Sequence, residues 1–260
     1  MRSEIVVGIK EFIKEKKQKE GIRNEVIRDD VFSVLEKECN VLYYSIDDTI
    51  EGCHILKPVN GEMEQFVFIN TAKVVQEQVW TAAHELGHVW QVDRIMKAIY
   101  DSCLEDNEAM VGRFAAEFLM PDTIFTEEVR NKLIEYHFEG DSISGHMMVE
   151  LVTYLMNFFC TPYKSVIRRF VETGFVDEQY EEEYLKCFEK NRQLYEKLIR
   201  ENQYTRLEEI KEVYSISNLQ KDLEFLEKRG VLRNKYLKRV RELFRINESA
   251  TIGNDLEFKV

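Results

Sequence analysis

The stretch from residue 84 to residue 88, His-Glu-Leu-Gly-His, constrains this chain more than any other part of it. Uncharged residues flank it on both sides, at 81–83 and 89–90. Apolar residues recur through the region at helical spacing, which predicts an amphipathic helix with one face packed on a core. The apolar stripe comprises Val75, Val79, Ala82, Leu86 and Val89.

On such a helix His84 and His88 lie one turn apart on the same face, opposite the apolar stripe. Both imidazoles can therefore reach one Zn²⁺ ion. Glu85 points about 100° around the helix, where it can take a proton from water at the metal. The pattern predicts a metal-binding helix. The alternative is a pair of solvent-exposed histidines on an amphipathic helix.

A catalytic zinc site has three protein ligands and one open position for water. Residues 101–121 predict a second helix, which ends at Pro121. Glu108 interrupts its apolar stripe, and a carboxylate there is costly unless it is paired or bound to a metal. Glu108 is therefore the predicted third ligand, and the alternative is an acid favoured by the helix dipole. The stripe comprises Leu104, Val111, Ala115 and Phe118.

These two segments resemble the ImmA/IrrE family of zinc metallopeptidases. Residues 82–89 carry the family's H-E-L-G-H, and residues 108–121 follow its E-x-x-A-x-x-F-A-x-x-L-L-x-P pattern. Val111 replaces the alanine of that pattern and Phe118 its first leucine. The resemblance covers about residues 20–176.

The resemblance implies a zinc metallopeptidase domain at residues 1–176, which includes a helix-turn-helix-like segment at about 145–176. Residues 177–260 then form a helical C-terminal module of unknown role. The expected fold class is α+β and mostly helical, with a small N-terminal sheet packed on the metal helix and a helical C-terminal region. Strands are predicted at 40–46, 52–56 and 64–70. Helices are predicted at 3–20 and 24–38, and after Pro121 at 123–138, 145–159, 163–173, 177–200, 204–214, 217–228 and 233–246.

The family implies a cytoplasmic endopeptidase that cuts a partner protein. The expected substrate is a DNA-binding repressor encoded nearby, whose loss derepresses genes of a mobile element, a phage or a stress response. Zn²⁺ is the expected cofactor, and Mn²⁺ or Fe²⁺ also suits such ligands. Glu85 would pass the proton from water to the departing amine. The alternative is a non-catalytic regulator that binds DNA or a partner through its helices and keeps a vestigial metal site.

The tetrahedral oxyanion of peptide hydrolysis needs a donor besides the metal. Candidates are His146, Tyr154, Tyr163 and Arg169, each of which could equally be an ordinary core or surface residue. Five histidines occur in the chain, and His54 and His137 have no partner pattern, so they are interpreted as structural. Glu105 and Glu117 lie off the apolar stripe and are predicted to be solvated surface acids.

The net charge of −12 disfavours direct binding of nucleic acid, because the chain as a whole repels phosphate. Residues 177–183 form an acidic run, whereas residues 228–241 are basic. The basic run predicts either a solvated helix face or a docking surface for an acidic partner or nucleic acid. The scattered cysteines without a C-x-x-C pair indicate a reducing compartment, and a metal role for Cys103 is less favoured. No apolar run is long enough to span a membrane, and the N-terminus has too many charges for a signal peptide.

Overall fold

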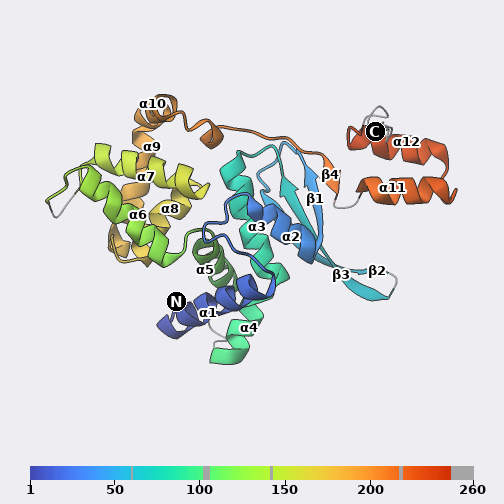
Figure 1. The fold of residues 1–260 in the computed structure, drawn as a ribbon, viewed down its shortest axis with the longest axis horizontal. Helices are drawn as coiled ribbons and strands as arrows, with labels where there is room; N and C mark the ends of the chain where they lie inside the picture. The colour runs from blue at the N-terminus through green and yellow to red at the C-terminus, as the bar shows by residue number, and fades with distance from the viewer. Residues whose placement is uncertain (60, 102–105, 141–142, 217–218, 247–260) are drawn as a thin grey trace, which may run out of the picture.

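The computed structural model describes residues 1–59, 61–101, 106–140, 143–216 and 219–246 (Figure 1). A small sheet lies near the centre, with one group of helices on one side of it and a helical hairpin on the other. This arrangement confirms the predicted α+β, mostly helical fold class. Within the described residues, none of the helices has the length and apolar character needed to cross a bilayer.

The N-terminal half carries the sheet and the predicted metal helix. Two helices come first, α1 (Ser3–Lys19) and α2 (Asp30–Glu38). They are followed by β1 (Asn40–Tyr44), β2 (Gly52–Val59), β3 (Glu62–Asn70), α3 (Val75–Val89), α4 (Val92–Tyr100) and α5 (Asn107–Leu119). The second predicted helix therefore begins later than expected, at Asn107, and α4 was not predicted.

The C-terminal half is mostly helical and contains one short strand. It contains α6 (Asp122–Glu135), α7 (Gly145–Phe159), α8 (Tyr163–Glu172), the 3₁₀ turn η1 (Glu178–Tyr180), α9 (Glu181–Lys190), α10 (Arg192–Asn202), the 3₁₀ turn η2 (Thr205–Leu207), β4 (Ser215–Ile216), α11 (Leu219–Lys228) and α12 (Asn234–Leu243).

The sheet has the strand order β2-β3-β1-β4, so β2 is an edge strand. β2 and β3 form an antiparallel hairpin, whereas β1 pairs with β3 in parallel. β4 comes from the C-terminal third of the chain and pairs antiparallel with β1 through Leu42 and Tyr43. The three predicted strands are confirmed, and the fourth strand was not predicted.

The predicted helix at 204–214 is wrong, because this segment contains only the 3₁₀ turn η2 and is otherwise irregular. The amide of Val75 donates to the carbonyl of Glu209 at 2.9 Å, and Thr71 Oγ1 donates to the carbonyl of Val213 at 2.9 Å. These contacts with the start of α3 satisfy backbone groups that a helix would have used internally. Tertiary pairing thus overrides the local helical preference of this segment.

Two further helix predictions differ from the structure at their boundaries. The predicted helix at 24–38 begins only at Asp30, and Arg28 has a φ of 51°, a left-handed conformation that a right-handed helix cannot include. The predicted helix at 177–200 is divided into η1, α9 and α10.

Helix α3 is the centre of the hydrophobic core. All five residues of its predicted apolar stripe are buried, as are Val111, Ala115 and Phe118 on α5, while Leu104 lies outside the described residues. α3 and α5 pack closely at Gly87, where an added Cβ would lie 2.8 Å from Val111 Cγ1 and 2.9 Å from Phe114 Cδ1. The glycine inside the His-Glu-Leu-Gly-His sequence therefore lets α5 approach α3 closely.

Helices α9 and α10 pack against the helices that precede them, and α11 and α12 form a hairpin beyond β4 (Figure 1). The buried residues Phe188 on α9 and Ile199 on α10 belong to the same apolar cluster as α3 and α5. The hairpin contacts the sheet through Phe244, whose ring centroid lies 6.1 Å from that of Tyr44 on β1. The division of the chain at residue 176 stays a prediction.

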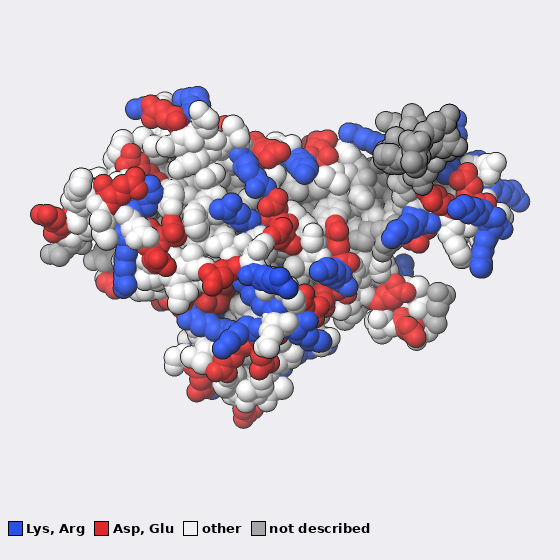
Figure 2. Space-filling model, viewed as in Figure 1, with Lys and Arg blue, Asp and Glu red and all other residues white. Residues whose placement is uncertain are grey.

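The basic run lies on the hairpin. Residues 219–246 carry nine Lys or Arg and four Asp or Glu, against a net charge of −12 for the whole chain. Figure 2 shows Lys and Arg side chains gathered over α11 and α12. One of them, Arg241, pairs with Glu227 at 2.6 Å and ties the two helices together. The role of this basic surface stays a prediction.

Candidate metal centre

Two helices bring the three predicted ligands together. His84 and His88 lie one turn apart on α3, and their ring centroids are 5.0 Å apart. Glu108 lies in the first turn of α5, which Asp106 caps by accepting a hydrogen bond from the Glu108 amide at 3.0 Å. This cap fixes the start of α5 beside α3.

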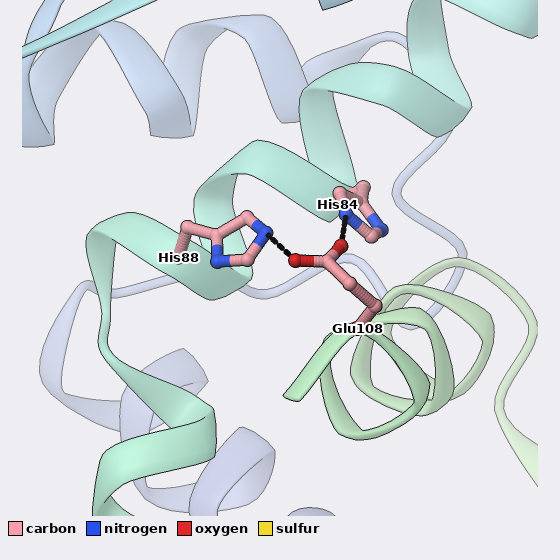
Figure 3. Close-up of side chains that lie close together, drawn as sticks. All are labelled: His84, His88 and Glu108. Atoms are coloured by element: carbon pink, nitrogen blue, oxygen red, sulfur yellow. Dashed lines mark hydrogen bonds and ion pairs between the residues drawn. The ribbon is translucent and has the colours of Figure 1, made fainter. Parts of the chain in front are cut away.

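The carboxylate of Glu108 lies between the two imidazoles (Figure 3). Its Oε2 is 3.0 Å from His84 Nε2, and its Oε1 is 3.5 Å from His88 Nε2. The three side chains can each offer one ligand atom, all within 4.8 Å of one another. Tetrahedral zinc holds neighbouring nitrogen and oxygen ligands about 3.3 Å apart, so these three donors fit such an ion.

Glu108 therefore lies beside the two histidines, as predicted. The structural reason for its position differs from the one expected. Its side chain is 64% exposed, so it does not interrupt a buried stripe. It lies at the start of a helix, where the dipole favours an acid, and it also faces both imidazoles. Cys103 and Glu105 lie outside the described residues.

The protonation of the cluster suits metal binding. Burial lowers the pKa of His84, and the neighbouring His88 lowers it further, while Glu108 partly opposes both effects. A histidine must be neutral to bind a metal, so this shift favours the ligand form. The donor set of two imidazoles and one carboxylate is one that catalytic divalent cations use.

Glu85 lies on the buried side of the same helix turn. Only 7% of the residue is exposed, and burial, helped by the charge of Glu108, raises its pKa to about 7. Strand β2 passes close to it, because a Cβ on Gly52 would lie 3.8 Å from Glu85 Cγ. That Cβ would also lie 2.5 Å from Thr81 Cγ2, so only glycine allows β2 this close to α3.

His54 also lies in this region, although it was interpreted from the sequence as a structural residue. Its ring on β2 stacks on that of His88 at a centroid distance of 6.2 Å, and its Nε2 lies 3.0 Å from Gln65 Oε1. His54 and Gln65 border a hollow of about 220 Å³ next to His88. Arg94 and Asn107 also line this hollow. The strand-turn-strand pattern at 52–70 predicts that His54 and Gln65 lie on neighbouring strands, but it does not place them beside α3.

The structure gives the four oxyanion candidates other partners. His146 is exposed beside Glu150, at 3.5 Å. Tyr154 donates to Glu128, and Tyr163 donates to Glu189 at 2.9 Å. These contacts hold His146, Tyr154 and Tyr163 to glutamates outside the His84–His88–Glu108 cluster.

Arg169 is fully buried and joins three elements. Its guanidinium lies 2.6 Å from both Glu117 on α5 and Asp122 on α6, and 3.0 Å from Glu172 on α8. Its Nε donates to the carbonyl of Met120 at 2.9 Å. The expectation that Glu117 is a solvated surface acid is wrong, because its carboxylate is buried against Arg169.

A comparison with protein families gives one match. A peptidase family model described as the IrrE N-terminal-like domain matches residues 40–170, about half of the chain. The matched range runs from β1 into α8 and contains the His84–His88–Glu108 cluster. No curated protein and no solved structure matches the chain.

Proposed function

The chain belongs to the peptidase family of the IrrE N-terminal-like domain, and from this premise we propose that it is a metal-dependent endopeptidase. The observation that carries the proposal is the convergence of His84, His88 and Glu108 with their ligand atoms within 4.8 Å of one another. A structural site closes around its ion with four ligands, whereas three ligands leave a position open for reaction.

We assign the metal to these three side chains. Zn²⁺ is the proposed ion, with Mn²⁺ or Fe²⁺ as alternatives, because imidazole and carboxylate suit all three. A cation bound there acts as a Lewis acid toward the attacking water and the scissile carbonyl.

Glu85 is the proposed general base and acid. Its neighbour in sequence is His84, and it projects from the same turn of α3. The carboxylate accepts the proton that the attacking water loses and then donates it to the departing amine, so that one residue serves both halves of the reaction. Burial between α3 and β2 shields this exchange from bulk solvent.

The edge strand β2 is the proposed support for the substrate. It ends the sheet next to α3, and its residue His54 stacks on His88. An extended peptide can pair its main chain with a free strand edge. A segment bound along β2 in this way would pass the metal ligands with its carbonyl groups in a fixed orientation.

The proposed substrate is a DNA-binding repressor encoded near this chain, and the proposed place of action is the cytoplasm. The family resemblance supports both, and the cysteine pattern also supports a reducing compartment. Cleavage would inactivate the repressor and derepress genes of a mobile element, a phage or a stress response.

The test uses the purified chain, the repressor encoded beside it, and Glu85→Gln. We expect the unaltered chain to cut the repressor at one position, identified by mass spectrometry, and a chelator to stop the reaction. Glu85→Gln should bind the metal with the same stoichiometry and cleave at least 100-fold more slowly, as general acid–base catalysis contributes about 10²- to 10⁴-fold.

Glu77→Gln is the matched control, because it makes the same change two turns earlier on α3. It should cleave at the rate of the unaltered chain. Cleavage by Glu85→Gln at the parental rate would remove Glu85 from the mechanism. Metal binding without cleavage of any repressor would favour the alternative, a non-catalytic regulator.

A further inference from the structure

The acidic run at residues 177–183 borders a cavity in the helical group that has no part in the proposed peptidase site. The cavity has a volume of about 710 Å³ and lies among α6, α7, α8 and α9. Sites for small molecules in proteins have volumes of roughly 300–1,000 Å³. The cavity is therefore large enough for a ligand of that class.

The deep part of the cavity is apolar. Val129, Met148, Leu151 and Phe170, from three different helices, line it and are all buried. Because these side chains offer no hydrogen-bonding group, they favour a hydrocarbon portion of a ligand.

The mouth of the cavity combines aromatic rings with carboxylates. Phe175, Tyr180 and Tyr184 supply the rings, and Asp177 and Glu183 supply the charges. Among the described residues, those that line the cavity include no Lys, Arg or His. A positive group is attracted both to ring faces and to carboxylates, whereas the two carboxylates repel a negative group.

The carboxylates at the mouth differ from the other acids of the run. Arg168 lies 2.6 Å from Glu181 and 3.4 Å from Glu178, and Lys186 lies 2.8 Å from Glu182. Asp177 and Glu183 have no such ion pair within the described part of the chain. They are thus the two acids of the run whose charge is not offset by a neighbouring base.

We propose that this cavity binds a small hydrophobic cation, an ammonium group carried on an apolar body. The ammonium group lies at the mouth among the three rings and the two carboxylates, and the apolar body extends toward Leu151. The site is separate from the proposed metal centre and needs neither metal nor peptidase activity.

Three probes with the same ten-carbon chain test this assignment on the full chain: decyltrimethylammonium, decanol and decanoate. Calorimetric titration at low salt, below the concentration at which the probes form micelles, measures each dissociation constant. We expect decyltrimethylammonium to bind tightest, by roughly tenfold over decanoate, because the head group alone changes between the probes. Equal affinities, tighter binding of decanoate, or no binding of any probe would overturn the proposal.

Charge variants locate the head group. Asp177→Asn combined with Glu183→Gln should reduce the affinity for decyltrimethylammonium several-fold, toward that for decanol, and leave decanol binding unchanged. Glu182→Gln is the matched control, since it lies beside Glu183 but does not line the cavity, and it should change nothing. An affinity for the ammonium probe that the double substitution leaves unchanged would contradict the assignment.

Cys187 reports on the apolar portion without any substitution. It lines the cavity and is only partly buried, so a bound ligand should slow its alkylation by iodoacetamide several-fold. Cys53 on β2 is outside the cavity and should react at an unchanged rate. Binding of decyltrimethylammonium that leaves Cys187 unprotected would place the probe elsewhere and overturn the proposal.

Discussion

Helix α5 carries two glutamates nine residues apart that meet opposite surroundings. Glu108 in its first turn is 64% exposed and faces two imidazoles. Glu117 in its last turn is 9% exposed and lies 2.6 Å from Arg169. The glutamate in the first turn of α5 is therefore available to an exchangeable ligand, whereas the one in the last turn is held in a buried ion pair. Burial and the permanent charge of Arg169 account for this difference.

The buried cluster around Arg169 holds α5, α6 and α8 together. Its guanidinium has carboxylate partners on all three helices, and Arg113 adds a second bond to Glu172. Breaking a buried ion pair costs more than its formation contributes, because the remaining charge loses its partner away from water. The cluster should therefore matter for stability and not for the metal centre.

The largest effect should follow from Arg169→Met. We expect it to lower the free energy of unfolding by about 3–5 kcal/mol, because three carboxylates are left without their shared base. Urea denaturation followed by circular dichroism measures this change. Arg168→Met, at a half-exposed neighbour, should cost less than about 1 kcal/mol. Similar costs for the two variants would show that burial does not distinguish these arginines.

Glu108→Ala should give the next largest effect, which is on metal affinity and not on stability. Groups that hydrogen-bond to the ligands of a metal ion contribute about 10- to 100-fold in affinity, so loss of a direct ligand should reduce metal affinity by at least about 100-fold. The free energy of unfolding without metal should change by no more than about 0.5 kcal/mol, as for an exposed residue. Elemental analysis after dialysis measures the metal. Full metal content in this variant would point to another third ligand.

Gly87→Ala tests how closely α5 must approach α3. The added Cβ would meet Val111 and Phe114 at less than 3 Å, so overpacking should destabilise the chain by about 1–3 kcal/mol. Metal affinity should fall as well, because Glu108 moves away from the imidazoles with α5. Gly112→Ala is the control on α5, where nothing lies within 4 Å of the added atom. Equal stability of both variants would contradict the close packing at Gly87.

The smallest effect should come from an exposed ion pair, Arg206 with Asp29 at 2.8 Å. Both side chains are nearly half exposed, so Asp29→Asn should cost only about 0.2–1 kcal/mol, and high salt should reduce that difference further. The same denaturation experiment in low and high salt measures it. A loss of unfolding free energy as large as that of Arg169→Met would contradict the expected difference between buried and exposed ion pairs.

Local patterns in the sequence were sufficient to predict helix α3 and the later part of α5. The stripe from Val75 to Val89 and the spacing of the histidines depend only on helix geometry, and the three strands before them follow from short apolar runs. Glu108 was identified by its place in a helical stripe, although the structure shows it exposed.

Contacts between distant parts of the chain could not be predicted in this way. Glu117 was interpreted as a surface acid because its partner, Arg169, is 52 residues away and on another helix. The path of residues 208–214 depends on hydrogen bonds from the Thr71 hydroxyl and the Val75 amide, and the position of His54 depends on how β2 packs against α3. In each case the deciding interaction is tertiary and leaves no periodic signal in the sequence.

The most direct test of the central claim is X-ray absorption spectroscopy of the zinc-loaded chain. Two imidazoles and one carboxylate predict only nitrogen and oxygen neighbours, at about 2.0–2.2 Å from the metal, with the multiple scattering typical of two histidines. The signal should disappear in a chain carrying His84→Ala and His88→Ala. A sulfur neighbour at about 2.3 Å, or zinc retained by the double variant with an unchanged spectrum, would contradict the assignment of the metal to α3 and α5.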